Sequence, residues 1–453
     1  MRGLRIHPLL KEIAAIFSRR GKQVFLVGGA VRDMFRGKDA QDWDLATDAL
    51  PEEVILMFPK VIPTGIKHGT VTVRYKGYSL EVTTFRTESE YHDGRRPNKV
   101  DYAATIEADL SRRDFTMNAI ALSLPEGRKV DPFDGVGDIK RRIIRCVGNP
   151  AERFGEDGLR PLRAVRFASQ LGFNIEDATL SAVNPSLRIT AKVAAERIRD
   201  EIDKIIGSPK PSRAFLLMEK TGLLELLLPE LARCRNIEQK GFHRFDVLDH
   251  SLLACDRAAQ KSWSAAVRLA ALFHDIGKPE TRLLDASGIW TFYQHERVSA
   301  ELVRKILARF RYSNEVVDRA VHLIKEHMFY YEEIWIDAAV RRFIIRVGEE
   351  NLPDLYRLRM ADAYAAAGKP PPKDFLLPLI RRVDKALAGG RAFSLKDLQI
   401  DGTDLIGIGV KAGPSIGIIL RELLETVVDD PALNTKEKLL EIARNLNLRY
   451  RSG

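Results

Sequence analysis

Residues 24–47 read VFLVGGAVRDMFRGKDAQDWDLAT, and this stretch decides the fold class of the N-terminal part of the chain. Four apolar residues at 24–27 predict a buried strand. Gly28 and Gly29 follow it, and they let the backbone turn tightly and approach a phosphate because neither carries a Cβ. Arg32 then supplies a fixed positive charge. The stretch therefore predicts a strand followed by a phosphate-binding turn.

Asp42 and Asp44 are separated by one residue in the next apolar run. Side chains at i and i+2 of a strand point the same way, so both carboxylates can serve one metal cluster. Such oxygen ligands suit magnesium, and two ions about 3.5–4 Å apart can activate an attacking hydroxyl and stabilise a leaving pyrophosphate. Glu81, in a later strand at 80–85, is the expected third carboxylate, although an exposed strand glutamate fits almost as well. The pattern predicts nucleotidyl transfer.

Each fragment alone favours a plainer interpretation, since most glycine pairs are turns and most Asp-x-Asp pairs are loops or caps. Their occurrence together and in this order favours the functional interpretation instead. The motifs that occur in sequence are GGAVRD at 28–33, DWDLAT at 42–47, EVTTFR at 81–86, SRRDFTMNAI at 111–120, DPFDGVGDI at 131–139 and EDGLRPLRAVRFA at 156–168. With these motifs, the first half of the chain resembles the class II tRNA nucleotidyltransferase and bacterial poly(A) polymerase family.

The resemblance implies roles for particular residues. Asp42 and Asp44 correspond to the magnesium ligands, and Gly28, Gly29 and Arg32 correspond to triphosphate contacts. The segment that carries Arg112, Arg113, Asp114 and Asn118 resembles the motif that binds sugar and phosphates, with Asp114 reaching the ribose hydroxyls. A surface Arg-Arg pair is usually only solvated, but its place inside RRDFTMNA favours the functional interpretation.

Asp157 and Arg160 are the residues that we expect to read the base, and Arg163 and Arg166 continue the same nucleotide-binding segment. On a helix, positions three apart face the same side. A carboxylate accepts and a guanidinium donates, so the pair matches an amino donor beside a ring-nitrogen acceptor, which cytosine and adenine offer and guanine and uracil do not. The alternative, a surface ion pair, contributes only about 0.2–0.5 kcal/mol. The functional interpretation predicts selection of CTP and ATP without a nucleic-acid template.

A second constellation follows downstream, and it resembles the HD metal-dependent phosphohydrolase domain. Its members are His250, the adjacent His274-Asp275 and Asp362. Imidazole with carboxylate suits manganese, iron, nickel or zinc, and a bound water would be the nucleophile. His295 and His327 are candidate ligands of a second ion, with a core histidine as the equal alternative. The domain either hydrolyses phosphoesters or serves mainly as a scaffold.

The predicted fold class is α+β. A polymerase beta-like nucleotidyltransferase head with a mixed sheet precedes an all-α neck, an HD-containing body and a tail. The expected ranges are 1–145 for the head, 146–210 for an RNA- and base-binding neck, 211–368 for the body and 369–453 for a tRNA-binding tail.

Particular elements are predicted within these parts. The expected strands are 24–27, 43–46, 70–75, 80–85 and 119–124, after an amphipathic helix at 6–16. A polar loop at 85–111 containing Gly94, Arg95 and Pro97 resembles the mobile loop beside the family's active site. The segment at 194–206 is expected to buttress the base-reading helix rather than touch substrate. A linker is expected at 369–373. In the tail, Gly413-Pro414 is expected to form a turn that either contacts tRNA phosphate or only caps a helix.

Charge and composition favour a polyanionic partner in a reducing compartment. Lys and Arg number 72 against 62 for Asp and Glu, giving a formal net charge of +10. The candidate phosphate contacts are Arg95-Arg96, Arg112-Arg113, Lys140-Arg141-Arg142 and Arg341-Arg342. No apolar run approaches the roughly 20 residues that span a bilayer. Cys146, Cys234 and Cys255 match no metal or disulfide pattern, which favours the cytoplasm.

The sequence therefore predicts an enzyme that uses CTP, ATP and Mg²⁺ to add CCA to the 3′ end of tRNA. Alternatives within the family are an A-adding or CC-adding enzyme and a bacterial poly(A) polymerase. The loop around Arg95 speaks against CC-only addition. From other classes, the chain could act mainly as an HD phosphohydrolase, or as a silent tRNA-binding module, which the intact carboxylates make improbable.

Overall fold

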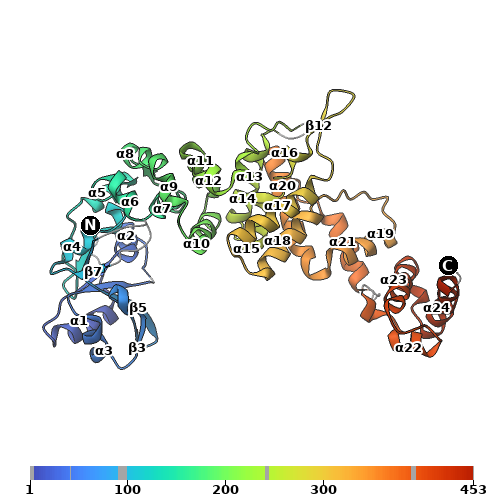
Figure 1. Ribbon diagram of the computed structural model, residues 1–453, viewed down its shortest axis with the longest axis horizontal. Helices are drawn as coiled ribbons and strands as arrows, with labels where there is room; N and C mark the ends of the chain where they lie inside the picture. The colour runs from blue at the N-terminus through green and yellow to red at the C-terminus, as the bar shows by residue number, and fades with distance from the viewer. Residues whose placement is uncertain (1–4, 41, 90–98, 240–243, 389–393, 452–453) are drawn as a thin grey trace. The chain divides into compact units, whose positions relative to one another are not determined.

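The computed structural model describes residues 5–40, 42–89, 99–239, 244–388 and 394–451. Figure 1 labels its helices and some of its strands. The chain forms two compact units. The first comprises Met1–Arg233 and Ile306–Tyr312, and the second comprises Cys234–Lys305 and Ser313–Gly453.

A seven-stranded sheet forms the centre of the head, in the order β3-β4-β5-β2-β1-β8-β9. Its strands are β1 (Val24–Val27), β2 (Asp44–Thr47), β3 (Val61–Gly65), β4 (Thr70–Tyr75), β5 (Tyr78–Thr84), β8 (Ala121–Ser123) and β9 (Lys129–Val130). The pair β2 and β5 is parallel and the other neighbours are antiparallel, so the sheet is mixed. The five expected strands are confirmed, with ends shifted by no more than two residues.

The register of the sheet places the acidic residues together. Val27 at the end of β1 pairs with Asp44, and Asp44 pairs with Glu81 of β5. Residues paired on adjacent strands present their side chains to the same face, so these two carboxylates are neighbours. Trp43 is buried and stacks on Tyr78 with 5.3 Å between ring centroids, which anchors the start of β2.

Helices cover this sheet because their apolar faces match it. Phe25, Val27 and Ala46 form one buried cluster with Ile106 and Leu110 of α4. The expected N-terminal helix is confirmed as α1, with Leu9, Leu10 and Ile13 buried. The helices of the first unit are α1 (Pro8–Ser18), α2 (Gly29–Phe35), α3 (Pro51–Met57), α4 (Ile106–Ser111), α5 (Gly135–Arg141), α6 (Pro150–Glu156), α7 (Arg160–Leu171), α8 (Asp177–Ser181), α9 (Leu187–Thr190), α10 (Ala195–Ile206), α11 (Pro211–Thr221), α12 (Leu223–Leu227) and α13 (Pro229–Ala232).

The polar segment at 85–111 is more regular than the sequence suggested. Strands β6 (Arg86–Ser89) and β7 (Lys99–Tyr102) pair antiparallel, and α4 follows, so the prediction of an irregular loop is wrong at both ends. Cross-strand pairing supplies the order that a polar composition did not indicate. Gly94, Arg95, Arg96 and Pro97 lie outside the described residues.

The second unit is built from helices, as expected for an HD body. They are α14 (Val247–Gln260), α15 (Ala265–Phe273), α16 (Lys278–Thr281), α17 (His295–Arg309), which continues into the first unit, α18 (Asn314–Glu326), α19 (Asp337–Val347), α20 (Leu352–Ala367), α21 (Leu377–Ala388), α22 (Gly402–Gly407), α23 (Pro414–Asp429) and α24 (Lys436–Arg451). Helix α14 packs against α15 and α20. The all-α description needs two corrections, because β10 (Ile143–Ile144) pairs with β11 (Asn174–Ile175) near the neck and β12 (Leu283–Leu284) with β13 (Trp290–Thr291) in the body.

The C-terminal helices have their own apolar core, formed by residues of α22, α23 and α24 such as Leu405, Leu423 and Leu439. The expected linker at 369–373 lies in the non-helical connection between α20 and α21, and Gly413 directly precedes α23. Arg341 of α19 is buried and donates to the carbonyl oxygens of Val428 and Asp429 at 2.6 and 3.2 Å. Its predicted role as a phosphate contact is therefore wrong, because its guanidinium is committed to the end of α23.

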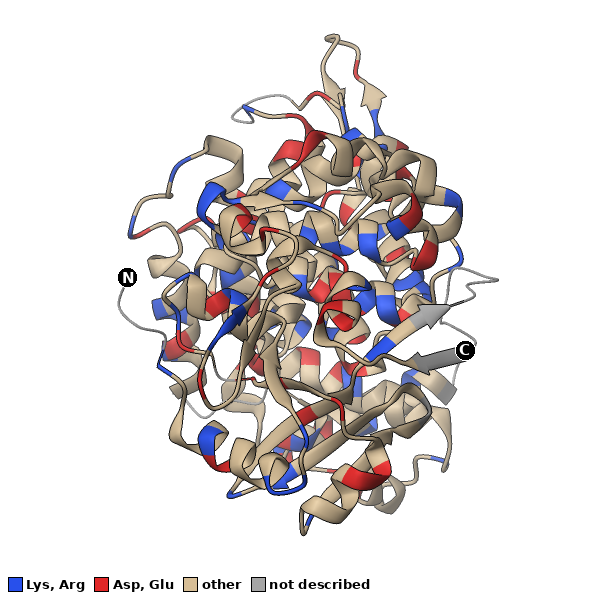
Figure 2. Cartoon of the chain, turned by 90° about the vertical axis from the view of Figure 1, so that its left-hand side faces the viewer, with Lys and Arg blue, Asp and Glu red and all other residues tan. Residues whose placement is uncertain are grey.

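Basic and acidic residues are interspersed along the described elements (Figure 2). Arg141, another predicted phosphate contact, pairs with Asp134 at 2.8 Å and Asp138 at 2.7 Å. Cys146, Cys234 and Cys255 are buried thiols. Among the described helices, none has the length and apolar character that a bilayer crossing requires.

Candidate functional site

A cavity of about 690 Å³ in the first unit brings the predicted nucleotidyl-transfer residues together. Every head and neck residue that the sequence placed at this site lines it. These residues are Gly28, Gly29, Arg32, Asp42, Asp44, Glu81, Arg112, Arg113, Asp114, Asn118, Asp157, Arg160, Arg163 and Arg166. The cavity therefore combines carboxylates from the sheet with guanidinium groups from the helices.

Three carboxylates gather at one end of the sheet. Asp42 lies just before β2, Asp44 begins it and Glu81 is the partner of Asp44 on β5. Burial and the neighbouring Glu81 raise the pKa of Asp44, with a further contribution from Asp42 and an opposing one from Arg113. Mutual repulsion of this kind is relieved by a bound cation, so this all-oxygen set fits a hard divalent metal.

Gly28 is required at the turn between β1 and α2. Its φ is +70°, a conformation that residues with a Cβ rarely adopt. A Cβ at this position would also lie 3.1 Å from Nη1 of Arg113 and 3.4 Å from Oδ2 of Asp44. The turn thus lets the backbone approach both the acidic and the basic side of the cavity.

Buried or half-buried carboxylates hold the cavity arginines in place. Asp109 of α4 is fully buried, and it accepts from Arg112 at 2.8 Å and from Arg113 at 3.1 Å. Arg32 donates to its neighbour Asp33 and, through Nη1, to Asn118 at 2.9 Å. The positive charge that the sequence predicted at Arg32 is therefore oriented by two partners.

Asp114 is the most strongly fixed acid of the cavity. It accepts from Asn118 Nδ2 at 3.1 Å, from the Phe115 backbone at 2.8 Å and from Arg163 at 2.7 Å. Burial alone would raise its pKa, but Arg163 and Asn118 outweigh burial and lower the pKa of Asp114 to about 2. The group is therefore an ionised acceptor at neutral pH, as a ribose hydroxyl requires.

The prediction that Asp157 and Arg160 share one helix is wrong. Asp157 follows α6 in an extended conformation, and Arg160 is the first residue of α7. The break occurs at Gly158, where a Cβ would lie 2.6 Å from the carbonyl oxygen of Ile189. This close approach requires a glycine at the break. Both side chains nevertheless line the same cavity.

Asp157 and Arg160 have separate partners. Asp157 accepts from the Leu159 backbone at 3.0 Å through Oδ1 and from Arg197 at 2.8 Å through Oδ2. Arg160 is buried, pairs with Glu156 and donates to the Arg112 carbonyl oxygen at 3.1 Å. Each charge is thus oriented by the protein before any ligand binds.

Helix α10 contributes more than the buttress that we expected. Glu201 does support α7 by pairing with Arg166, and both side chains are buried. Arg197 and Lys204 of the same helix line the cavity, and the sequence analysis did not assign them. Their positions, with Glu201 between them, have the i, i+4, i+7 spacing of one helix face, and this polar stripe is the signal that could have identified them.

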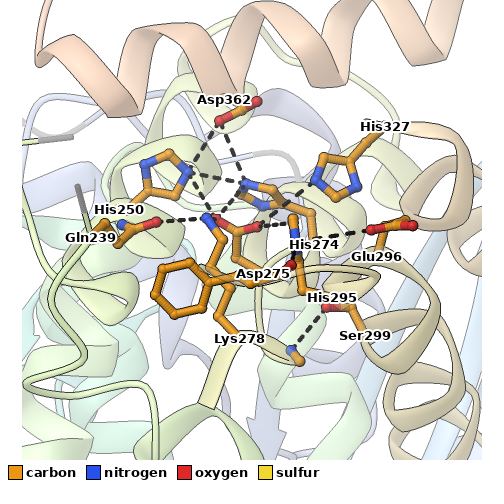
Figure 3. A network of polar contacts seen from close by, with 12 residues as sticks. Gln239, His250, His274, Asp275, Lys278, His295, Glu296, Ser299, His327 and Asp362 are labelled. Atoms are coloured by element: carbon orange, nitrogen blue, oxygen red, sulfur yellow. Dashed lines mark hydrogen bonds and ion pairs between the residues drawn. The ribbon is translucent and has the colours of Figure 1, made fainter. Parts of the chain in front are cut away.

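A second site lies in the second unit, where four histidines and two aspartates converge (Figure 3). His250 Nε2 is 3.2 Å from Asp362 and 3.4 Å from Asp275, and His274 Nε2 is 3.7 and 3.4 Å from the same carboxylates. His295 and His327 approach the other oxygen of Asp275 at 3.1 and 3.8 Å. All six side chains are buried.

The histidines of this cluster are oriented for metal binding. The Nδ1 atoms of His274, His295 and His327 lie 3.0, 2.8 and 2.6 Å from backbone carbonyl oxygens, which can only accept. Each Nδ1 therefore carries the proton, and the Nε2 lone pair faces the cluster. Burial, with His274 and His295, lowers the pKa of His327 to about 3, so its imidazole is neutral.

Two ligand triads share His274: His250, His274 and Asp362 form one, and His274, Asp275 and His327 form the other. Within each triad, the potential ligand atoms lie within 4.8 Å of one another. Burial would raise the pKa of Asp275, but His274 and Lys278 outweigh burial and hold the pKa well below its usual range. Lys278 Nζ lies 2.6 Å from the carboxylate of Asp275. The neutral imidazole of His327 and the ionised carboxylate of Asp275 are forms that bind transition metals.

Comparison with known proteins agrees with this geometry. Residues 24–145 match the poly A polymerase head domain, residues 172–234 the probable RNA and SrmB-binding site of polymerase A, and residues 247–367 the HD domain. The CCA-adding enzyme of Lactobacillus delbrueckii subsp. bulgaricus is 35% identical over 444 residues, which cover 97% of this chain and 99% of that enzyme. The chain belongs to the CCA-adding enzyme family.

Other members of the CCA-adding enzyme family support the assignment. The enzyme of Geobacillus stearothermophilus is 34% identical over 438 residues, covering 95% of this chain and 96% of that protein. The crystal structure of the Bacillus stearothermophilus CCA-adding enzyme in complex with CTP superposes with a TM-score of 0.76 at 30% identity, covering 99% and 100% of the two chains. The predicted fold and the prediction of a nucleotidyltransferase are confirmed, and membership implies dependence on a divalent metal ion.

Proposed function

We propose that the chain adds C, C and A to the 3′ end of tRNA from CTP and ATP, releasing pyrophosphate. The observation that carries this proposal is the single cavity shared by three carboxylates, an ionised ribose-side aspartate and a base-facing pair of opposite charge. The relatives named CCA-adding enzymes and the related structure in complex with CTP support it. Because tRNA and nucleoside triphosphates are the substrates, we place the reaction in the cytoplasm.

Asp42, Asp44 and Glu81 are the residues that would hold magnesium ions, since together they offer only oxygen ligands. Magnesium held there would supply Lewis-acid activation of the 3′-hydroxyl and would neutralise charge that develops on the phosphates. Glu81 is included because its register position places it beside Asp44.

The remaining groups of the head bind and orient the nucleotide. Arg32, Arg112 and Arg113 offset the negative charge of the triphosphate, and their carboxylate partners keep them directed at the cavity. Asp114 accepts a hydrogen bond from a ribose hydroxyl, which a deoxyribonucleotide lacks at the 2′ position. Asn118 connects Arg32 and Asp114, because it accepts from Arg32 and donates to Asp114.

Asp157 and Arg160 select the base. The carboxylate of Asp157 accepts from the exocyclic amino group of cytosine or adenine, and the guanidinium of Arg160 donates to the adjacent ring nitrogen. Uracil and guanine would place an acceptor against the carboxylate and a donor against the guanidinium. Arg163 and Arg166 complete the positive face of α7, and Arg163 also orients Asp114.

Elongation assays on truncated tRNAs test the proposed function directly. We expect tRNA that ends before CCA to receive C, C and A, tRNA that ends after the first C to receive C and A, and tRNA that ends after both Cs to receive A alone. Each NTP is supplied separately and in mixtures, and the products are sequenced. Addition restricted to A or to CC, or a longer A tail, would replace the proposal with the corresponding family activity.

We also propose a division of labour along the chain. Residues 1–145 would form the catalytic head, 146–210 the neck that contacts the base and the RNA end, 211–368 the HD body and 369–453 the tail that holds tRNA. The cavity, which combines residues from the first two parts, supports the assignment of the head and neck. Limited truncation with measurement of tRNA affinity tests the role of the tail.

For the HD cluster, we propose a divalent transition metal site with accessory phosphodiesterase activity. The residues that would hold the ions are His250, His274, Asp275 and Asp362, with His295 and His327 as further ligands. Manganese, nickel, iron and zinc all suit this mixed set, and bound metal would supply an activated water. A scaffold role is the competing possibility.

Asp275→Asn tests the metal proposal. This change is expected to lower manganese or nickel binding and cyclic-nucleotide hydrolysis by about 10²-fold or more, because it removes a carboxylate that contacts three histidines. CCA addition should persist. The matched control is Glu301→Gln, an exposed acid of α17. If wild type and Asp275→Asn show no metal-dependent difference, the scaffold interpretation holds.

A further inference from the structure

Arg197 is the cavity residue that binds and orients the carboxylate of Asp157. It projects from α10, and its Nη2 donates to Oδ2 of Asp157 at 2.8 Å across 40 residues of sequence. The other oxygen, Oδ1, accepts from the backbone of Leu159 at 3.0 Å. Both carboxylate oxygens are therefore tied, so the carboxylate plane of Asp157 has one orientation.

The orientation leaves room for a ligand. An ionised carboxylate has about four acceptor positions, and two of those of Asp157 are occupied by Arg197 and Leu159. Two remain, and they have fixed directions. A base amino group must meet one of these directions, whereas a freely rotating carboxylate could accommodate several base edges at lower cost.

Helix α10 is itself a rigid support for Arg197. On its cavity side, Glu201 pairs with Arg166 of α7 in a buried contact. On another side, Tyr312 donates to Asp203 at 2.6 Å and Arg311 pairs with Glu196. Ile198 and Ile202 are buried between these polar anchors. Because α10 is held on several sides, Arg197 has a defined position, and its hydrogen bond fixes the carboxylate of Asp157 in turn.

We infer that Arg197 is a specificity-determining positioning residue that fixes the base-reading carboxylate of Asp157 and so excludes UTP and GTP. The inference rests on the proposed function, because it assigns Arg197 to the nucleotide selection described above. Arg197 need not touch the base, since its effect passes through Asp157.

The test is nucleotide selectivity of Arg197→Gln. We expect the ratio of kcat/KM for CTP over UTP, and for ATP over GTP, to fall by about tenfold, the scale of one charge-assisted hydrogen bond. Arg197→Lys should recover part of the ratio because it keeps the charge. Arg188→Gln, at an exposed cation of α9 that does not line the cavity, is the control and should match wild type. A folding defect would lower all four values together and leave both ratios unchanged.

A double-substitution cycle separates the possible outcomes. In an Asp157→Ala background, Arg197→Gln should cause no further loss of selectivity, because the group that it positions is gone. Full selectivity in Arg197→Gln, with selectivity lost in Asp157→Ala, would overturn this inference and leave the proposed function intact. Full selectivity in Asp157→Ala would instead refute the base-reading assignment itself.

Discussion

Asp44→Ala is expected to slow nucleotide addition by about 10³-fold or more, because loss of metal-held transition-state stabilisation removes several kcal/mol. Asp44 pairs in register with Glu81, and Asp42 and Arg113 line the same cavity and act on its carboxyl electrostatically. Asp44 is the only carboxylate of β2 (Asp44–Thr47). Affinity for tRNA should change little, since this residue lies on the metal side of the cavity rather than on a basic surface.

Single-turnover addition to tRNA that lacks CCA, with binding measured in parallel, is the appropriate measurement. Asp42→Ala should behave similarly. Asp39→Asn is a matched control, because Asp39 is exposed just upstream and does not line the cavity. Normal turnover in Asp44→Ala would exclude this carboxylate as a metal ligand and would move the reaction to another part of the chain.

Asp157→Ala is expected to lower discrimination against UTP and GTP by about 10²-fold, because a polar site that bonds one base edge rejects others through unpaired groups. The side chain is about 20% exposed and lies between two helices, so its removal should affect folding less than selection. Arg160→Ala should also reduce selection. It carries a greater folding cost, because Arg160 is buried and bonded to Glu156 and to the backbone of Arg112.

Misincorporation measured by sequencing the extended tRNA, with all four NTPs present, provides the readout. Asp177→Asn serves as the control, since Asp177 is an exposed acid at the start of α8 outside the cavity. Undiminished discrimination in both Asp157→Ala and Arg160→Ala would show that base choice resides elsewhere.

The strands and the acidic motif could be predicted because their signals are local. A run such as Val24 to Val27 is buried on both faces, and Asp42 with Asp44 keeps its spacing in any fold. The set of cavity residues could be predicted only through a resemblance that spans separated motifs. Neither periodicity nor composition would have brought Asp114 beside Arg163.

The partners of the site residues could not be predicted, because they depend on tertiary contacts. Asp109 supports Arg112 and Arg113 from inside α4, and Arg197 reaches Asp157 from a helix 40 residues away. The break between α6 and α7 likewise lies where Gly158 closely approaches the backbone of Ile189. Sequence spacing suggested one continuous helix because it contains no information about this approach.

Arg341 sets a limit on how the chain can be shortened. Its buried guanidinium donates to the last carbonyl oxygens of α23, and neighbouring Ile345 packs against the C-terminal apolar core. A version that stops within α23, before Val428, would remove these acceptors and divide the apolar core. Deletions that cut there are expected to report misfolding rather than loss of an RNA contact. A fragment that ends before α19 would also lose α20, which packs against α14 and carries Asp362.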